Sequence, residues 1–264
     1  MSWGNLELGA VVNLVLSLVV LSRRLLSRSG AAAAFLIGTS IYTCLGWQGW
    51  LVLCAFFFGG TAASFYQLGR KQRLGVAQAE GGRRRWRHAW ANAGVGVLCA
   101  AAAAWNLWRG DPLQAEACRW AFVACFAAAL SDTLSSEFGQ LAGQAPRLIT
   151  TGEEVKVGTD GGITRAGTLM GLLGATLLSL LGRFLDITPV RATLPVLLAG
   201  LSGNLLDSYL GATLERQGRL SNEGVNFTNT LAGAVLGWGG FWGMRALAHW
   251  MQAHGMVTWS DAFI

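Results

Sequence analysis

The sequence predicts an all-α membrane protein, a polytopic bundle of about seven or eight transmembrane helices. Of its 264 residues, 53% are hydrophobic and only 13% are charged, whereas a soluble domain carries about a quarter charged residues. The 36 glycines and the long alanine runs suit helices that pack closely in a bilayer. Several of the 12 tryptophans stand near the ends of apolar stretches, where their rings prefer the headgroup level.

Eight apolar stretches have about the length that a membrane-spanning helix needs, which is roughly 20 residues. They lie near Leu6–Leu21, Ala31–Leu45, Trp50–Tyr66, Ala89–Trp108, Ala117–Leu130, Ala166–Leu185, Thr193–Leu214 and Asn226–Trp250. The second and fifth are short, so the sequence leaves open whether these two cross the bilayer fully. We expect residues 1–264 to form a single integral membrane domain.

Basic residues predict the orientation of these helices. They cluster after the first stretch and after the third, at Arg23, Arg24, Arg28, Arg70, Lys71, Arg73, Arg83, Arg84, Arg85 and Arg87. The positive-inside rule therefore places the first and third connections in the cytoplasm and the amino terminus on the non-cytoplasmic side. Counting onward, the connections 131–165 and 215–225 are cytoplasmic too, and the polar motifs described next fall on that side.

Net charge and cysteine content exclude some other classes of protein. In this composition the net charge of +6 indicates loops facing anionic lipid rather than a nucleic-acid partner. The basic loop 69–88 either anchors to headgroups or helps to grip an anionic phosphate substrate. The five cysteines lack the spacing of a zinc site or a disulfide framework, so we interpret them as small buried apolar residues.

Two acidic residues mark the end of the fifth apolar stretch, in the segment SDTLSSEFG (131–139). Asp132 and Glu137 have no basic neighbour there, and a carboxylate at a membrane boundary is costly unless a cation neutralises it. Mg²⁺ often binds one or two carboxylates together with substrate phosphates. The segment is therefore a candidate metal or catalytic site, and a solvated helix end with incidental acids is the alternative.

A loop rich in glycine and threonine precedes the sixth stretch, in the segments PRLITT (146–151) and VGTDGGIT (157–164). Its N–H groups and hydroxyls, with the positive end of the following helix, can hold phosphate. Arg147, Lys156 and Arg165 can add charge, although the spacing is not that of a Walker A motif. A plain turn is the alternative. The candidate phosphate-binding residues are Arg147, Thr150, Thr151, Lys156, Gly158, Thr159, Gly161, Gly162 and Thr164.

Polar residues also interrupt the seventh stretch, in the segment GNLLDSYLG (203–211). Asn204, Asp207 and Ser208 fall on one side of a helix with Gly211. A carboxylate within a span is a functional-site hypothesis by default. A hydrogen bond that joins two helices is the alternative.

The last stretch begins with Asn222, Asn226 and Asn229, and Gly233 and Gly237 continue their helical spacing. We interpret the amides as the wall of a polar pocket and the glycines as a close contact between helices. A role in packing alone is the alternative.

Several of these segments together resemble one family of membrane proteins. They are DTLSSEFGQ, PRLITTGEEVKVGTDGGITRAGTLMG, GNLLDSYLGATLE and LSNEGVNFTNTLAGA, with the basic segment GRRRWRHAWANAG upstream. The family includes transmembrane protein nineteen of animals and the plant phytyl-phosphate kinase of vitamin E synthesis, and the resemblance covers the chain from about Ala31 to Gly237. A weaker likeness exists to dolichol kinases and phosphatidate cytidylyltransferases. Asp160 and the pair Ser135-Ser136 depart from the family pattern without removing a carboxylate.

The resemblance implies a CTP-dependent, Mg²⁺-assisted kinase that converts an isoprenoid monophosphate, such as phytyl or another prenyl phosphate, to the diphosphate, as in tocopherol biosynthesis. Its motif positions are Asp132, Glu137, Gly158, Thr159, Gly161, Gly162, Asn204, Asp207, Asn222 and Asn226. We expect Asp132, Glu137 and Asp207 to be the catalytic residues and to hold the metal. The loop 158–164 would cradle the triphosphate. The residues expected to orient the nucleotide or the acceptor are Asn204, Ser208, Asn222, Asn226 and Asn229. The apolar faces of the late spans would bind the isoprenoid tail.

Two other functions remain open from the sequence. One is a cytidylyltransferase that forms a CDP-lipid and releases pyrophosphate. The other is a membrane transporter or flippase, because buried polar residues also mark substrate paths. The chain length of the isoprenoid, the nucleotide preference and the oligomeric state are not specified by the sequence.

Overall fold

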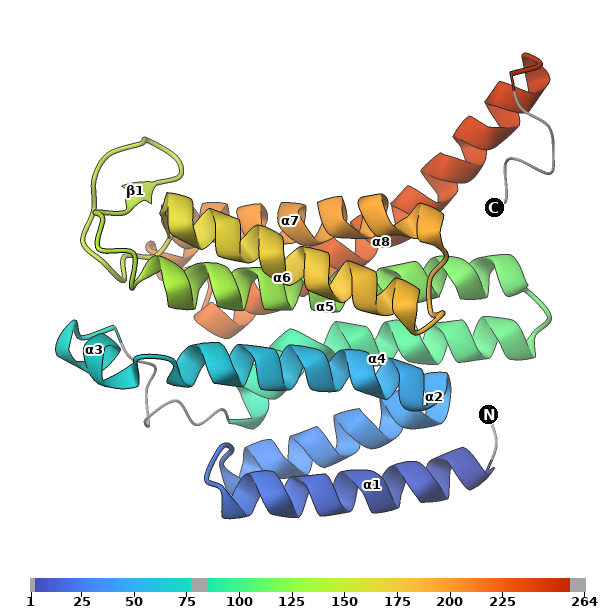
Figure 1. Ribbon diagram of the computed structural model, residues 1–264, viewed down its shortest axis with the longest axis horizontal. Helices are drawn as coiled ribbons and strands as arrows, with labels where there is room; N and C mark the ends of the chain where they lie inside the picture. The colour runs from blue at the N-terminus through green and yellow to red at the C-terminus, as the bar shows by residue number, and fades with distance from the viewer. Residues whose placement is uncertain (1–2, 77–84, 257–264) are drawn as a thin grey trace.

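The computed structural model describes residues 3–76 and 85–256, and most of them are helical. The long helices run side by side in one bundle (Figure 1). They are α1 (Trp3–Ser22), α2 (Arg28–Phe65), α4 (Trp86–Trp108), α5 (Pro112–Gly139), α6 (Arg165–Phe184), α7 (Thr193–Leu210) and α8 (Asn222–Ala253). The short elements are α3 (Leu68–Arg73), strands β1 (Arg147–Leu148) and β2 (Gly162–Ile163), a 3-10 turn (Val190–Ala192) and a π-helical turn (Gly211–Glu215). The predicted all-α class is confirmed.

The second and third predicted spans are the two halves of α2. Gly46 interrupts this helix with a φ of 69° and a ψ of −166°, a conformation that glycine adopts without the steric cost of a Cβ atom. The chain reverses direction there (Figure 1). With the two halves of α2 counted separately, the described part of the chain therefore has eight long helical segments, as the sequence predicts.

Four helical segments are long and apolar enough to cross a membrane, judged by length and composition within the described residues: Gly4–Ser22, Arg28–Phe65, Pro112–Gly139 and Arg165–Phe184. The fifth predicted span is longer than expected, because α5 continues through the acidic segment to Gly139. At 1.5 Å per residue its 28 residues measure about 42 Å, enough to cross. Helix α7, which carries Asn204 and Asp207, is not among these four segments.

Side-chain caps set where several of these helices begin. Ser27, Asp111, Thr164 and Ser221 each accept a hydrogen bond from the N–H group three residues later, at the starts of α2, α5, α6 and α8. Pro112 follows Asp111 at the first helical position of α5, where its missing N–H has no intrahelical role. Short polar side chains thus mark the boundaries between helix and connection.

The connections α1–α2, α2–α4, α5–α6 and α7–α8 all lie at the same end of the bundle (Figure 1). This is the arrangement that counting the predicted spans implies. We refer to this end of the bundle as the loop end. Its assignment to the cytoplasm stays a prediction from the positive-inside rule.

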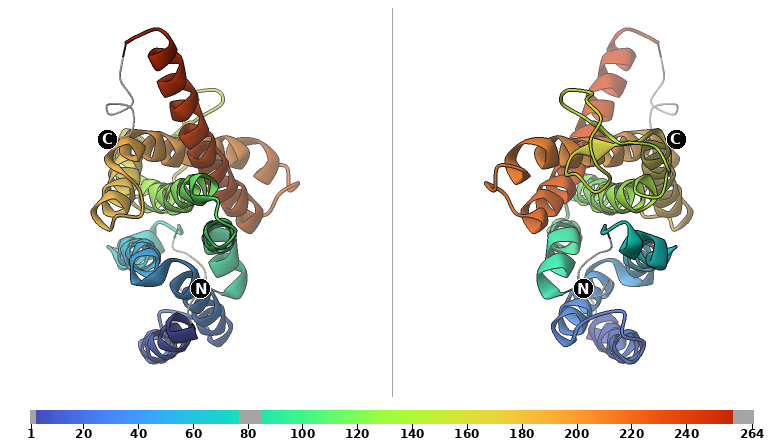
Figure 2. Two further views of the ribbon diagram at one scale, coloured as in Figure 1. Left: turned by 90° about the vertical axis from the view of Figure 1, so that its right-hand side faces the viewer. Right: turned by 90° about the vertical axis from the view of Figure 1, so that its left-hand side faces the viewer.

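Helix α5 occupies the centre of the bundle. Residues 120–130 are all buried, and α2, α4, α6, α7 and α8 pack around them, as the views along the helices show (Figure 2). The segment is rich in alanine, and a helix that is apolar all round belongs in a core. Its small side chains let the neighbouring backbones come close.

Glycines on the surrounding helices complete this close approach. A Cβ atom at Gly200 of α7 would stand 2.9 Å from the Cβ of Ala127, and one at Gly233 of α8 would stand 2.8 Å from the Ala124 carbonyl oxygen. At Gly237 a Cβ would meet the Ala124 Cβ at 2.6 Å. Real Cβ atoms essentially never come this close, so these positions have room for glycine only.

We predict that Gly237→Ala destabilises the bundle by about 1–3 kcal/mol, because the added methyl group overpacks the contact with α5. The matched control is Gly239→Ala on the same helix, where a Cβ would meet nothing within 4 Å. That variant should be neutral or slightly stabilising, because alanine favours helix. Thermal unfolding of both purified variants in detergent measures the difference, and equal midpoints would contradict it.

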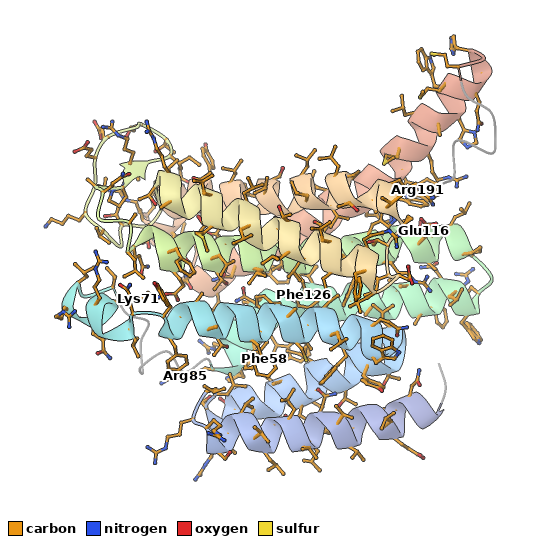
Figure 3. All side chains as sticks on the ribbon, viewed as in Figure 1. Phe58, Lys71, Arg85, Glu116, Phe126 and Arg191 are labelled. Carbon is orange, nitrogen blue, oxygen red and sulfur yellow. The ribbon has the colours of Figure 1, made fainter. Side chains whose placement is uncertain are left out.

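An ion pair buried at the loop end, where Figure 3 labels Lys71, joins α3 to α5. Lys71 Nζ lies 2.6 Å from Glu137 Oε2, and the two side chains are 1% and 4% exposed. Ser64 donates to Glu137 Oε1 at 2.8 Å, and Lys71 also donates to the Ala63 carbonyl oxygen at 2.7 Å. Every charged atom of the pair thus has a partner, which is what a buried ion pair requires.

We predict that Lys71→Met destabilises the protein by about 3–5 kcal/mol, because it leaves the Glu137 carboxylate buried without a counter-ion. The double variant Lys71→Met/Glu137→Leu should recover most of that loss, since both charges are gone. Arg147→Met is the control: it breaks the exposed pair with Glu154 and should change stability by at most about 1 kcal/mol. Denaturant unfolding in detergent reports all three, and similar losses from Lys71→Met and Arg147→Met would refute the prediction.

Candidate active site

A polar cavity of about 630 Å³ opens at the loop end. The last turns of α5, the loop between α5 and α6, the end of α7 with the π-helical turn, the start of α8 and the start of α4 form its wall. Most of the site residues that the sequence predicts line this one cavity: Asp132, Gly158, Thr159, Gly161, Gly162, Thr164, Asn204, Asp207, Ser208, Asn222 and Asn226. The fold thus brings together residues that are up to 94 positions apart, from Asp132 to Asn226. Their chemical roles stay predictions.

Asp132 on α5 and Asp207 on α7 both line this cavity, near enough for their carboxyl groups to repel each other when both are ionised. Two carboxylates this close cannot both stay ionised without a proton or a cation between them. The pair therefore forms a candidate cation site, made by the packing of α7 on α5.

Asn204 holds these two helices in register beside the acidic pair. Its Nδ2 donates to Ser131 Oγ at 3.0 Å, and Asn204 is buried. Ser131 directly precedes Asp132, and Asn204 lies one turn before Asp207. The Asn204 amide therefore lines the cavity and joins α7 to α5 at once.

The glycine-rich loop lines the same cavity as the acidic pair. The strands β1 and β2 pair antiparallel at its base, and Gly158 and Gly161 adopt positive φ angles of 86° and 75°, which favour glycine. A Cβ at Gly161 would overlap the backbone nitrogen of Ala212 at 2.4 Å. The loop is thus docked directly on the π-helical turn, a feature frequently found at functional sites.

Hydrogen bonds within the loop limit which groups remain for a ligand. The N–H of Thr159 donates to the Lys156 carbonyl, and the N–H of Gly162 donates to the Thr159 carbonyl. The Thr164 hydroxyl caps α6 by accepting from the Gly167 N–H. The expected cradle therefore depends on the other N–H groups of the loop and on the first turn of α6.

Six predicted site residues lie outside the cavity wall: Glu137, Arg147, Thr150, Thr151, Lys156 and Asn229. Arg147 is exposed and pairs with Glu154, and Lys156 is exposed as well. Asn229 is fully buried against Gly203, and its amide has no hydrogen-bond partner within the described chain. Its place between α7 and α8 fits the packing alternative rather than the pocket wall.

Glu137 pairs with Lys71 instead of joining Asp132. Residues five positions apart on an α-helix are rotated by about 140° at 3.6 residues per turn, so the two carboxylates of α5 face different neighbours. Among the described residues no group of three or more His, Cys, Asp or Glu side chains is arranged to hold a metal ion. The expected ligand set Asp132, Glu137 and Asp207 is therefore reduced to a pair.

Other charged residues in the wall were not among the predicted site residues. Asp160, Glu215 and Glu223 add carboxylates, and Arg85 and His88 bring the start of α4 to the cavity. Burial raises the pKa of the Glu215 carboxyl, and the nearby Asp160 adds to the rise. Glu215 and Glu223 flank the connection before α8, whereas Arg85 and His88 lie at the end of the basic loop. Only the tertiary fold brings these two regions to the same cavity. Residues 77–84 of that loop lie outside the described residues.

Comparison with known proteins identifies the family. The model of the family "Integral membrane protein DUF92" matches residues 11–234, which run from α1 into α8 and include the whole described cavity wall. No solved structure matches significantly.

Among related proteins, Protein VTE6, chloroplastic, of Arabidopsis thaliana is 37% identical over 80% of this chain and 64% of its own length. An uncharacterized membrane protein of Synechocystis sp., sll0875, is 34% identical over 81% of this chain and 82% of its own. Protein PGR of Arabidopsis thaliana is 33% identical over 81% and 88%. The chain belongs to the DUF92 family of integral membrane proteins.

Proposed function

We propose that this protein is a membrane-bound kinase that transfers a phosphoryl group from a nucleoside triphosphate, CTP by preference, to an isoprenoid monophosphate, giving the diphosphate. The observation that carries the proposal is that Asp132 and Asp207 lie near each other in the wall of one cavity that the glycine-rich loop also lines. The resemblance of the same motifs to the plant phytyl-phosphate kinase supports the choice of reaction. The similarity to VTE6 over four fifths of the chain is consistent with it.

The acidic pair fits Mg²⁺ by the nature and number of its ligands. Mg²⁺ typically takes one or two protein carboxylates, with waters and substrate phosphates completing its shell, and two facing carboxyl groups supply that set. Bound there, the ion would neutralise charge on the phosphates. Glu137 is left out of this set, because Lys71 already neutralises it.

The remaining residues of the cavity bind and position the substrates. The glycine-rich loop and the start of α6 offer N–H groups and a positive helix end to the triphosphate. Asn222 and Asn226, joined by a hydrogen bond of 3.1 Å, present amides from α8. Phosphoryl transfer depends mostly on such positioning and on charge neutralisation. A phosphate monoester is largely ionised at pH 7, so the acceptor needs no general base.

We predict that Asp132→Asn and Asp207→Asn each lower the rate of phosphoryl transfer at least about 100-fold, because each removes a carboxylate that would hold the Mg²⁺ ion neutralising the transferred phosphate. The assay uses purified protein with γ-labelled CTP, Mg²⁺ and phytyl or geranylgeranyl monophosphate. The control is Asp186→Asn, since Asp186 is exposed and pairs with Arg183 at the opposite end.

The position of the label separates the alternatives. Label from the γ-phosphate in a prenyl diphosphate supports the kinase, whereas transfer of α-labelled CMP to the lipid with release of pyrophosphate would identify a cytidylyltransferase. If folded wild-type protein transfers nothing from any nucleotide to any prenyl phosphate, the kinase proposal fails and transport becomes the leading hypothesis.

A second prediction distinguishes the roles of the three acids. The double variant Lys71→Met/Glu137→Leu removes the buried ion pair and keeps Asp132 and Asp207. It should stay within about tenfold of the wild-type rate and keep the same dependence on Mg²⁺ concentration, because a structural pair can be replaced by apolar side chains. A folded double variant with a strongly raised Mg²⁺ requirement would instead make Glu137 a metal ligand.

A further inference from the structure

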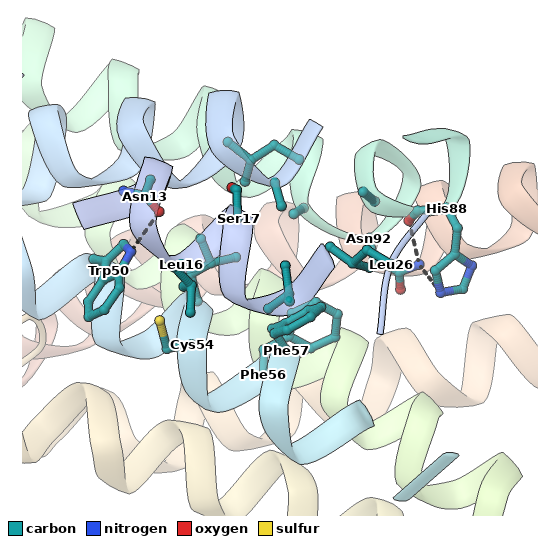
Figure 4. Close-up of a pocket in the computed structure, with 16 residues that line it drawn as sticks. Asn13, Leu16, Ser17, Leu26, Trp50, Cys54, Phe56, Phe57, His88 and Asn92 are labelled. Atoms are coloured by element: carbon teal, nitrogen blue, oxygen red, sulfur yellow. Dashed lines mark hydrogen bonds between the residues drawn. The ribbon is translucent and has the colours of Figure 1, made fainter. Parts of the chain in front are cut away.

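A second cavity lies next to the candidate active site, enclosed by α1, α2 and α4 (Figure 4). Its volume is about 70 Å³, and its wall is largely apolar, including Leu16, Ile37, Leu53 and Phe57. Helix α1 packs chiefly on α2, so the space between α1 and α4 is left incompletely filled. Protein interiors are normally close-packed, and an unfilled apolar pocket suits an apolar ligand better than water.

Amide groups in the wall of this pocket are already satisfied. Asn13 Oδ1 accepts a hydrogen bond from Trp50 Nε1 at 2.9 Å, and Asn13 Nδ2 donates to the Gly9 carbonyl at 2.8 Å. Asn92 donates to the His88 carbonyl at 3.0 Å (Figure 4). An apolar ligand would therefore leave these amides paired as they are.

His88 lines both cavities. Arg85, one turn before it on α4, lines the polar cavity, and Ala89 and Ala93, on the following turns, line the apolar one. One face of α4 thus leads from the polar cavity, at the positive end of the helix, into the apolar pocket. The side chain of Asn92, within 3.4 Å of His88 Nε2, braces the imidazole at the boundary.

We propose that the pocket between α1, α2 and α4 binds the hydrocarbon tail of the acceptor, with its phosphate held beside Arg85 and His88. The inference rests on the proposed function and locates the acceptor at the early helices, whereas the sequence suggested the late spans for the tail. An isoprenoid phosphate joins an anionic head to a branched apolar chain, which matches a polar cavity that shares a wall with an apolar one.

The pocket takes part of the chain and not all of it. In the second half of α2 the lining residues extend from Trp50 to Phe57, a distance of about 10 Å along the helix. A volume of 70 Å³ is below the 150 Å³ or so that holds a benzene molecule. The segment nearest the phosphate is therefore enclosed, and the rest of the tail extends between α1 and α4 toward the bilayer.

The test compares two leucine substitutions on the same half of α2. Ala34 lines the pocket, whereas Ala32 is exposed and does not. Ala34→Leu should raise the KM for geranylgeranyl phosphate about tenfold, the factor expected when roughly two methylene groups lose their buried contacts. The KM for CTP, which has no tail to place in the pocket, should change less than twofold, and Ala32→Leu should leave the KM values of both substrates unchanged. An equal effect of Ala34→Leu on both substrates, or no effect on either, overturns the proposal.

A binding experiment separates this inference from the proposed reaction. Wild-type protein in detergent is photolabelled with a prenyl monophosphate that carries a diazirine near the phosphate end of its tail, and the labelled peptides are mapped. Label on residues 50–57 or 85–93, lost in Ala34→Leu and competed by unlabelled prenyl phosphate, supports the site even if no phosphoryl transfer occurs. Label confined to α6, α7 or α8, or pocket label that phospholipid removes as readily as prenyl phosphate, refutes it.

Discussion

The close packing of the other helices on α5 is the constraint on which the rest of this structure depends. Because residues 120–130 are enclosed on all sides, the surrounding helices must present their smallest residues to them. Gly200, Gly233 and Gly237 do so within contact distances that no other residue allows. The same approach brings the loop ends of α5 and α7 together, and with them Asp132 and Asp207.

Acidic side chains at this end of the bundle are stabilised in two ways. Glu137 is buried, and Lys71, Ser64 and the backbone around them satisfy it completely. Asp132 and Asp207 face each other in a cavity wall that also holds Asp160 and Glu215. Like charges so close need a cation or a proton. The contrast gives the pair of Lys71 and Glu137 a structural role and makes Asp132 and Asp207 the candidate cation site.

The two cavities give the loop end an amphiphilic character. A polar space bounded by the glycine-rich loop adjoins a smaller apolar one between the early helices, and His88 belongs to both walls. A substrate with an anionic head and an apolar tail, as proposed above, fits this juxtaposition because each part meets a surface of matching polarity.

The sequence by itself determined the all-α class, the eight long helical segments and the gathering of polar motifs at one end of the bundle. Hydropathy and helical periodicity are local properties of the sequence, and the bilayer requires helices that satisfy their own backbone hydrogen bonds. The sequence also singled out Asp132, Asp207, Asn204 and the glycine-rich loop. Only the tertiary structure decided that Glu137 turns away to Lys71, that Asn229 lies in a packing contact, and that Arg85, His88 and Glu215 reach the cavity. Those outcomes depend on which helix faces meet. Long-range packing determines which faces these are, and no local sequence pattern encodes it.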